Sequence, residues 1–124
     1  MTNQAQNPKS KKVYDLIERT SVFGEGVVDF VKTLPRDEIN KTLISQLVRS
    51  GTSVGANYME ADCAESKKDF IHKMTICKKE AKETLHWIRI IAHANQNRKD
   101  ECRDLYRESH ELLLIFSAII GKKK

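Results

Sequence analysis

The sequence is poor in the residues that β-rich and loop-rich proteins need. Its 124 residues include two prolines, five glycines and only 6% aromatic residues. A sandwich or barrel requires many turn residues, so this composition disfavours both and favours helices. No stretch alternates polar and apolar residues as a half-buried strand does. We therefore predict an all-α protein, and its length predicts a single domain.

Paired cysteines and long apolar runs are also missing. Cys63, Cys77 and Cys102 lie far apart. Such spacing indicates neither a disulfide framework nor a zinc site, and we expect buried, reduced thiols. The first residues do not resemble a signal peptide, and the apolar run at 112–120, which Ser117 interrupts, is too short to cross a bilayer. We expect a cytoplasmic protein that has no membrane segment.

The motifs of common enzyme classes do not occur in this sequence. Di-iron four-helix bundles carry two Glu-x-x-His motifs, whereas only one such spacing occurs here, at Glu83 and His86. The run RSGTSVG at 49–55 has neither the spacing nor the lysine of a phosphate-binding loop. No histidine stands in a nucleophile motif. We predict a protein that is not an enzyme and has no catalytic residue, cofactor or metal site.

Four segments show apolar residues at helical spacing. We predict helices at residues 13–34, 37 to about 64, 67 to about 94, and 99–121. Pro35 ends the first helix, Ser66 is the expected N-cap of the third, and residues 95–97 form a turn before the fourth. Short connections between such helices predict an up-and-down antiparallel four-helix bundle over 13–121. Basic tails at 1–12 and 122–124 flank it.

Each helix is expected to bury one apolar face. In the third helix we predict that face to be Phe70, Met74, Cys77, Ala81, Leu85, Ile88 and Ala92. Gly51 and Gly55 are four residues apart in the second helix, which allows a neighbouring helix to approach closely. Gly24 and Gly26 each weaken the first helix by about 1 kcal/mol relative to alanine.

Some apolar residues fall outside these faces. The run at 112–116 is apolar throughout and therefore points all around its helix. Ile76 and Trp87 lie together on the third helix, away from its predicted core face. Because a monomeric bundle buries only one stripe per helix, these residues predict self-association into a homo-oligomer.

Charge is unevenly distributed along the chain. The net charge is +5, and the two tails hold six lysines, so the bundle itself is near neutral. Six cations of the third helix nevertheless fall within about a third of its circumference. We call them the cationic strip: Lys67, Lys68, Lys78, Lys79, Lys82 and Arg89.

The cationic strip has two interpretations. It can follow a nucleic-acid backbone through sequence-independent phosphate contacts. Alternatively, it is a solvated face on which Glu80 or Glu83 pairs with the neighbouring lysines. Aromatic residues interleave poorly with the strip, so the sequence gives little sign of base stacking on single strands.

The second helix carries five polar residues at steps of three or four. We call them the polar stripe: Gln46, Arg49, Ser53, Asn57 and Glu60. They form a solvated surface, a hydrogen-bonding network between helices or subunits, or a ligand-binding face. Serine and asparagine are mediocre helix formers, so their alignment in mid-helix favours the network.

Several short motifs together suggest a family. They are QL-x-RS at 46–50, TSVGANY-x-EA at 52–61, SKKDF at 66–70, KEA-x-E at 79–83, ERT at 18–20 and F-x-K-x-LP at 30–35. With these motifs the chain resembles the proteins of 23S rRNA intervening sequences, which are sometimes labelled ribosomal-protein-like. The resemblance implies a four-helix bundle that assembles into a ring, expected to be a homopentamer. It also implies a fold similar to accessory proteins of diversity-generating retroelements, and it brings no catalytic residues.

We predict a non-enzymatic oligomeric bundle that binds nucleic acid through the cationic strip. RNA is the expected ligand because of where the related reading frames occur, and DNA is the other candidate. The alternative function is a scaffold that binds a protein partner and no nucleic acid. Its interface residues would be the polar stripe together with Ile76 and Trp87.

Overall fold

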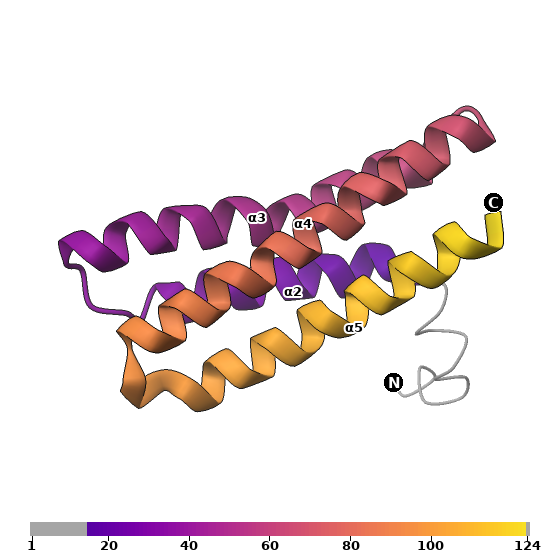
Figure 1. Cartoon of the computed structure of the whole chain (residues 1–124). Helices are drawn as coiled ribbons and strands as arrows, with labels where there is room; N and C mark the ends of the chain where they lie inside the picture. Colours follow the sequence, from indigo (N-terminus) through magenta and orange to yellow (C-terminus); the bar gives the residue numbers. More distant parts are fainter. Residues whose placement is uncertain (1–14, 124) are drawn as a thin grey trace, which may run out of the picture.

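The computed structural model describes residues 15–123, which form four α-helices and no strand. The helices are α2 (Leu16–Val31), α3 (Glu38–Asp62), α4 (Lys67–Ala94) and α5 (Lys99–Lys123), with a short 3-10 helix, η2 (Gln96–Arg98), before α5. They lie side by side, and consecutive helices run in opposite directions (Figure 1). The all-α prediction and the four predicted helices are confirmed. The predicted tail at 1–12 lies outside the described residues.

Helix ends follow from local sequence. Asp37 caps α3 by accepting a 2.7 Å hydrogen bond from the Asn40 amide, and Ser66 caps α4 by accepting one of 3.0 Å from Asp69. The Ser66 cap was predicted. α2 ends at Val31, before the turn that leads into Pro35, so it is shorter than expected. α5 takes in Lys122 and Lys123, two residues beyond the predicted end of the bundle.

The core is formed by one stripe from each helix, but the predicted stripe of α4 is partly wrong. Phe70, Leu85 and Ala92 are only half-buried. The buried residues of α4 are Met74, Cys77, Ala81, Thr84, Ile88 and Ile91. Thr84 can be buried because its hydroxyl has partners there, with Ser50 Oγ at 2.9 Å and the Glu80 carbonyl oxygen at 2.7 Å. The apolar pattern alone could not reveal this pairing.

α2 and α3 pack closely at a crossing of small residues. A Cβ atom on Gly51 would lie 3.1 Å from Val27, and one on Gly55 would lie 3.2 Å from the Thr20 hydroxyl. Both distances are shorter than ordinary van der Waals contact. The prediction that Gly51 and Gly55 admit a neighbouring helix is therefore confirmed.

One end of the bundle is held by buried amides. Asn40 and Asn95 are 2% and 6% exposed, and they exchange side-chain hydrogen bonds of 3.0 and 2.9 Å. Nearby, Arg98 donates to Thr33 Oγ1 at 2.8 Å and lies 5.2 Å from the centroid of the Phe30 ring. These contacts connect the α2–α3 loop, the start of α3 and the turn before α5. We call this region, made by Thr33, Asn40, Asn95 and Arg98, the clamped end.

The opposite end gathers lysines where α4 begins and α5 finishes (Figure 1). Lys67 and Lys123 line the same two shallow depressions, with Lys68 in one and Lys122 in the other. The Lys123 ammonium lies 5.7 Å from the centroid of the Phe70 ring. None of these four lysines forms an ion pair with any residue of 15–123. We call these four residues the lysine end.

Candidate functional site

The six residues of the cationic strip are all exposed along α4. They are regularly spaced because α4 is one uninterrupted helix from Lys67 to Ala94. Within the described part of the chain, none of the six forms an ion pair. The structure thus leaves the whole strip open to an anionic ligand. Its first two residues also belong to the lysine end, which extends the cationic surface onto α5.

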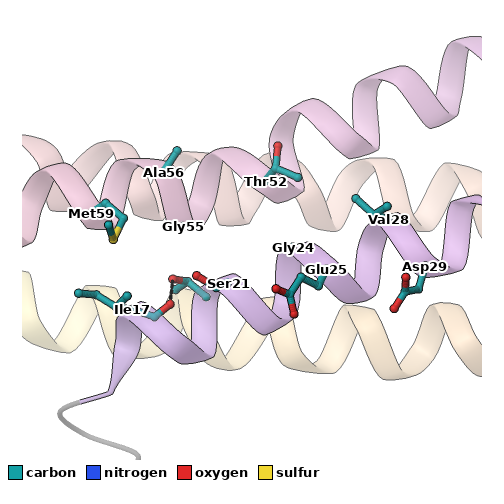
Figure 2. A pocket seen from close by; sticks show the side chains of 11 residues that line it. Ile17, Ser21, Gly24, Glu25, Val28, Asp29, Thr52, Gly55, Ala56 and Met59 are labelled. Carbon is teal, nitrogen blue, oxygen red and sulfur yellow. Dashed lines mark hydrogen bonds between the residues drawn. The ribbon is translucent and has the colours of Figure 1, made fainter.

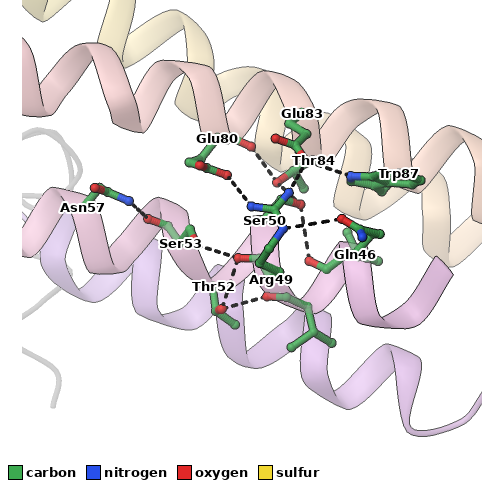
Figure 3. Close-up of polar contacts among 12 residues, drawn as sticks. Gln46, Arg49, Ser50, Thr52, Ser53, Asn57, Glu80, Glu83, Thr84 and Trp87 are labelled. Carbon is green, nitrogen blue, oxygen red and sulfur yellow. Dashed lines mark hydrogen bonds and ion pairs between the residues drawn. The ribbon is translucent and has the colours of Figure 1, made fainter. Parts of the chain in front are cut away.

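The acids next to the strip are bound from the other side, by α3. Figure 3 shows Arg49 extending between the two helices toward Glu80 and Glu83. Its guanidinium forms ion pairs with both carboxylates, at 3.4 Å for Glu80. The indole of Trp87 also donates a 3.0 Å hydrogen bond to Glu83. The predicted pairing of these acids with strip lysines is therefore wrong, because both carboxylates form ion pairs with Arg49 instead.

The polar stripe divides into two kinds of contact (Figure 3). Arg49 also donates to Gln46 at 3.4 Å, and Glu60 binds Lys73 of α4 at 2.6 Å. Ser53 and Asn57 instead donate to carbonyl oxygens of their own helix, at 2.6 and 2.8 Å. The stripe therefore connects α3 to α4 at Arg49 and Glu60. Its role toward other molecules stays a prediction.

The ion pair between Glu60 and Lys73 shifts both groups in the expected directions. The hydrogen bond from Lys73, supported by its charge, lowers the pKa of Glu60 and raises the pKa of Lys73. Both groups are exposed enough that solvent screens the pair. It orients side chains between α3 and α4 more than it stabilises the fold.

The apolar residues predicted to lie outside the core are mostly half-buried. Trp87 packs against the core, and Ile76 is also only partly exposed. In the run at 112–116, the first and last residues are fully buried, whereas Leu114 is 54% exposed. Leu114 lines a depression of about 460 Å³ that also includes Ile115 and Ile119. The run therefore leaves one apolar patch on α5, smaller than the sequence suggested.

A larger apolar groove lies between α2 and α3, and the sequence analysis missed it. Figure 2 shows Ile17 beside Met59 at one end and Val28 toward the other. The groove has a volume of about 550 Å³, and these three side chains are 37–49% exposed. The available signal was Ile17 and Val28, two apolar residues about three helical turns apart that lie outside the buried stripe of α2.

The cysteines offer no reactive centre in the interior. Burial raises the pKa of the Cys77 thiol to about 12 and also raises that of Cys102. Cys63 is exposed, so the prediction of three buried thiols is wrong at that position, which lies at the C-terminus of α3. Within residues 15–123, no three histidine, cysteine or acidic side chains come close enough together to bind a metal ion.

The helices can be compared with what crossing a bilayer requires in length and apolar character. Among the helices of the described range, none combines the length and the apolar character that crossing a bilayer requires. α5 contains the longest apolar run, but charged residues occupy both of its ends.

Comparisons with known proteins agree with the motifs and the fold. The family model described as 23S rRNA-intervening sequence protein matches residues 12–118. Among solved structures, the chain is similar to a protein of unknown function from the S23 ribosomal protein family of Bacteroides thetaiotaomicron. The two share 31% identity with a TM-score of 0.77, over 84% of this chain and 96% of that one. No curated protein matches the chain. The four helices and the match along nearly all of the sequence show that this chain belongs to the 23S rRNA-intervening sequence protein family.

Proposed function

We propose that this protein is a non-enzymatic, oligomeric RNA-binding bundle of the cytoplasm, and that the cationic strip contacts RNA phosphates. The observation that carries the proposal is the division of charge around α4. Six cations lie exposed without an ion pair in the described structure, while Arg49 binds the two acids beside them. A phosphate that approaches the strip breaks no existing ion pair.

The dimensions of the strip fit a polyanion. From Lys67 to Arg89 it follows α4 for about 33 Å at the helical rise per residue. The lysine end adds Lys122 and Lys123 at one end of this line. Contacts of this kind release counterions, so affinity depends on salt and little on sequence. The geometry therefore supports binding to an RNA backbone rather than recognition of particular base pairs.

The test compares two variants of equal charge. The first carries Lys78→Gln, Lys82→Gln and Arg89→Gln in the strip. The control carries Lys32→Gln, Arg36→Gln and Lys41→Gln, three exposed cations near the start of α3. RNA affinity is measured by titration at several salt concentrations.

We expect wild type to bind structured RNA at low salt, with log affinity falling linearly with log salt. The strip variant should lose about 2 to 3 units of that slope, because each phosphate contact contributes about 0.7 to 0.9. The control should keep most of the wild-type slope. Equal losses in both variants would mean that only net charge matters, and no binding by wild type would contradict the proposal.

Self-association is part of the proposal, with a homopentameric ring as the expected assembly. Two surfaces support it, namely the apolar groove between α2 and α3 and the patch around Leu114. A ring would repeat the cationic strip and multiply its contacts with one RNA. Native mass spectrometry with and without nuclease measures both the number of protomers and any bound nucleic acid. A monomer under both conditions would contradict this part.

The alternative is a scaffold that binds a protein partner through the polar stripe. Arg49 favours it in one respect, because 46% of its side chain stays exposed although it holds two carboxylates. Asn57→Ala is the cleaner variant, since the Asn57 amide bonds only its own helix and its loss leaves Arg49 in place. The scaffold predicts a partner that survives nuclease treatment and is lost from Asn57→Ala.

A further inference from the structure

α4 and α5 form a shallow groove beside the last residue of the cationic strip. Its volume is about 370 Å³. Ala92 contributes apolar surface, and Ile88 and Cys102, which are 1% and 2% exposed, lie beneath it. Tyr106 of α5 also lines it, and this ring is 42% exposed although it is a large aromatic side chain. The groove therefore combines an apolar surface with an accessible aromatic ring.

Three cations surround this surface. Arg89 comes from α4, and Lys99 and Arg103 come from α5. Arg89 and Lys99 form no ion pair with residues of the described chain. Arg103 binds Asp100 at 2.9 Å, but the two side chains are 61% and 89% exposed, so solvent screens this pair and an anion can replace it.

We propose that this groove binds an unpaired nucleobase of a single-stranded RNA segment. Tyr106 stacks on the base, and Arg89, Lys99 and Arg103 contact the phosphates on either side. The inference rests on the proposed RNA binding and specifies which part of the RNA this end of the strip takes. Tyr106 could not be linked to the strip from sequence alone, because it lies on α5 and the strip lies on α4.

The chemistry of the groove favours a nucleotide, with its neutral base and its phosphates, over a simple anion. A flat ring with phosphates beside it matches an apolar floor, an exposed aromatic face and a cationic rim. Paired bases in a duplex are stacked on one another, so their faces cannot reach Tyr106 without being flipped out. A simple anion would contact the three cations but would not stack on the Tyr106 ring.

The experiment measures affinity for two RNAs of equal length, a single-stranded oligonucleotide and a fully paired duplex. We expect Tyr106→Leu to weaken single-strand binding by about five- to 150-fold, which is the range for loss of one stacked base. Duplex binding should change less than twofold. Tyr106→Phe should keep single-strand affinity, because it keeps the ring. Ile39→Ala is the control, since Ile39 is an apolar residue that is 67% exposed and lines neither this groove nor the two surfaces proposed for self-association.

The outcomes separate this inference from the proposed function. If wild type binds neither RNA, the proposed function fails, and the inference fails with it. If wild type binds both and Tyr106→Leu leaves both affinities unchanged, the strip stands and the base site is overturned. Equal weakening on both RNAs also overturns it. If Tyr106→Leu changes the native mass of the assembly, the groove holds a second copy of the chain, and the base site is again overturned.

Discussion

The two ends of the bundle use polar residues in opposite ways. At the clamped end, Asn40 and Asn95 satisfy each other in the interior, and Arg98 has a carboxylate, a hydroxyl and an aromatic ring as partners. At the lysine end, four ammonium groups come together without a carboxylate from the described residues. The polar groups of the clamped end are paired with one another, whereas the lysine end holds positive charge that no carboxylate of residues 15–123 pairs with.

This difference separates stability from binding. Buried and satisfied polar groups fix how helices meet, since leaving either partner alone is costly. Exposed like charges contribute little to the fold but attract counterions and polyanions. The clamped end thus sets the geometry of α3 and α4, and the lysine end extends the cationic surface of α4 onto α5.

Breaking the clamp should cost the most. Asn95→Ala removes both hydrogen bonds to Asn40 and leaves a buried amide oxygen without a donor, so we expect a loss of about 2 to 3 kcal/mol in the free energy of unfolding. Denaturant unfolding measures it. Asn97→Ala, at an exposed position in the same turn, should change stability by less than about 0.5 kcal/mol. Equal effects from the two variants would contradict a stabilising role for the clamp.

The lysine end should tolerate added volume. A Cβ on Gly121 meets no atom within 4 Å, so Gly121→Ala should stabilise α5. The gain should stay below the value of about 1 kcal/mol for a mid-helix site, because Gly121 is close to the end of the helix. Gly55→Ala is the matched comparison, since its Cβ would press on Thr20. We expect no gain there. A gain at Gly55 equal to that at Gly121 would show that α2 and α3 are less tightly packed than described.

The smallest effect concerns pH. A hydrogen bond from Arg98 lowers the pKa of Glu101. Because the folded-state pKa lies below the unfolded one, the contribution to stability is complete above the ordinary glutamate pKa and is lost as pH falls through the lowered value. Wild type should therefore exceed Glu101→Gln in melting temperature at neutral pH and converge with it in acid.

Lys67→Gln sharpens that measurement. Lys67 has no carboxylate partner within residues 15–123. The difference in melting temperature between Lys67→Gln and wild type should therefore not change over the same acid range. An acid dependence as large as that of Glu101→Gln would contradict the contrast between the two ends.

The fold could be predicted from sequence because its determinants are local. Helical spacing, Pro35 and the Ser66 cap each act within a few residues, and so they place the helix ends to within a few positions. The pairing of Asn40 in α3 with Asn95 in the turn after α4 joins residues 55 positions apart, and no local pattern around either residue predicts it. The same is true of Thr84, whose burial depends on a hydroxyl in another helix.

In the candidate site, too, only the features that lie within one helix could be predicted from sequence. The cationic strip belongs to one helix, so helical geometry was enough to find it. The partners of its neighbouring acids come from α3, and the aromatic ring at its end comes from α5. Both required knowing which helices touch. Sequence reasoning therefore found the charges but not what surrounds them.

Arg49 affects the charge beside the cationic strip. It is a basic residue of α3 that serves as the counterion of Glu80 and Glu83 on α4. Removing it would release two carboxylates beside the strip, with Glu83 within one helical turn of Lys79, so a single substitution would subtract one positive charge and unmask two negative ones. The net charge beside the strip is thus set in part by a residue of another helix, α3.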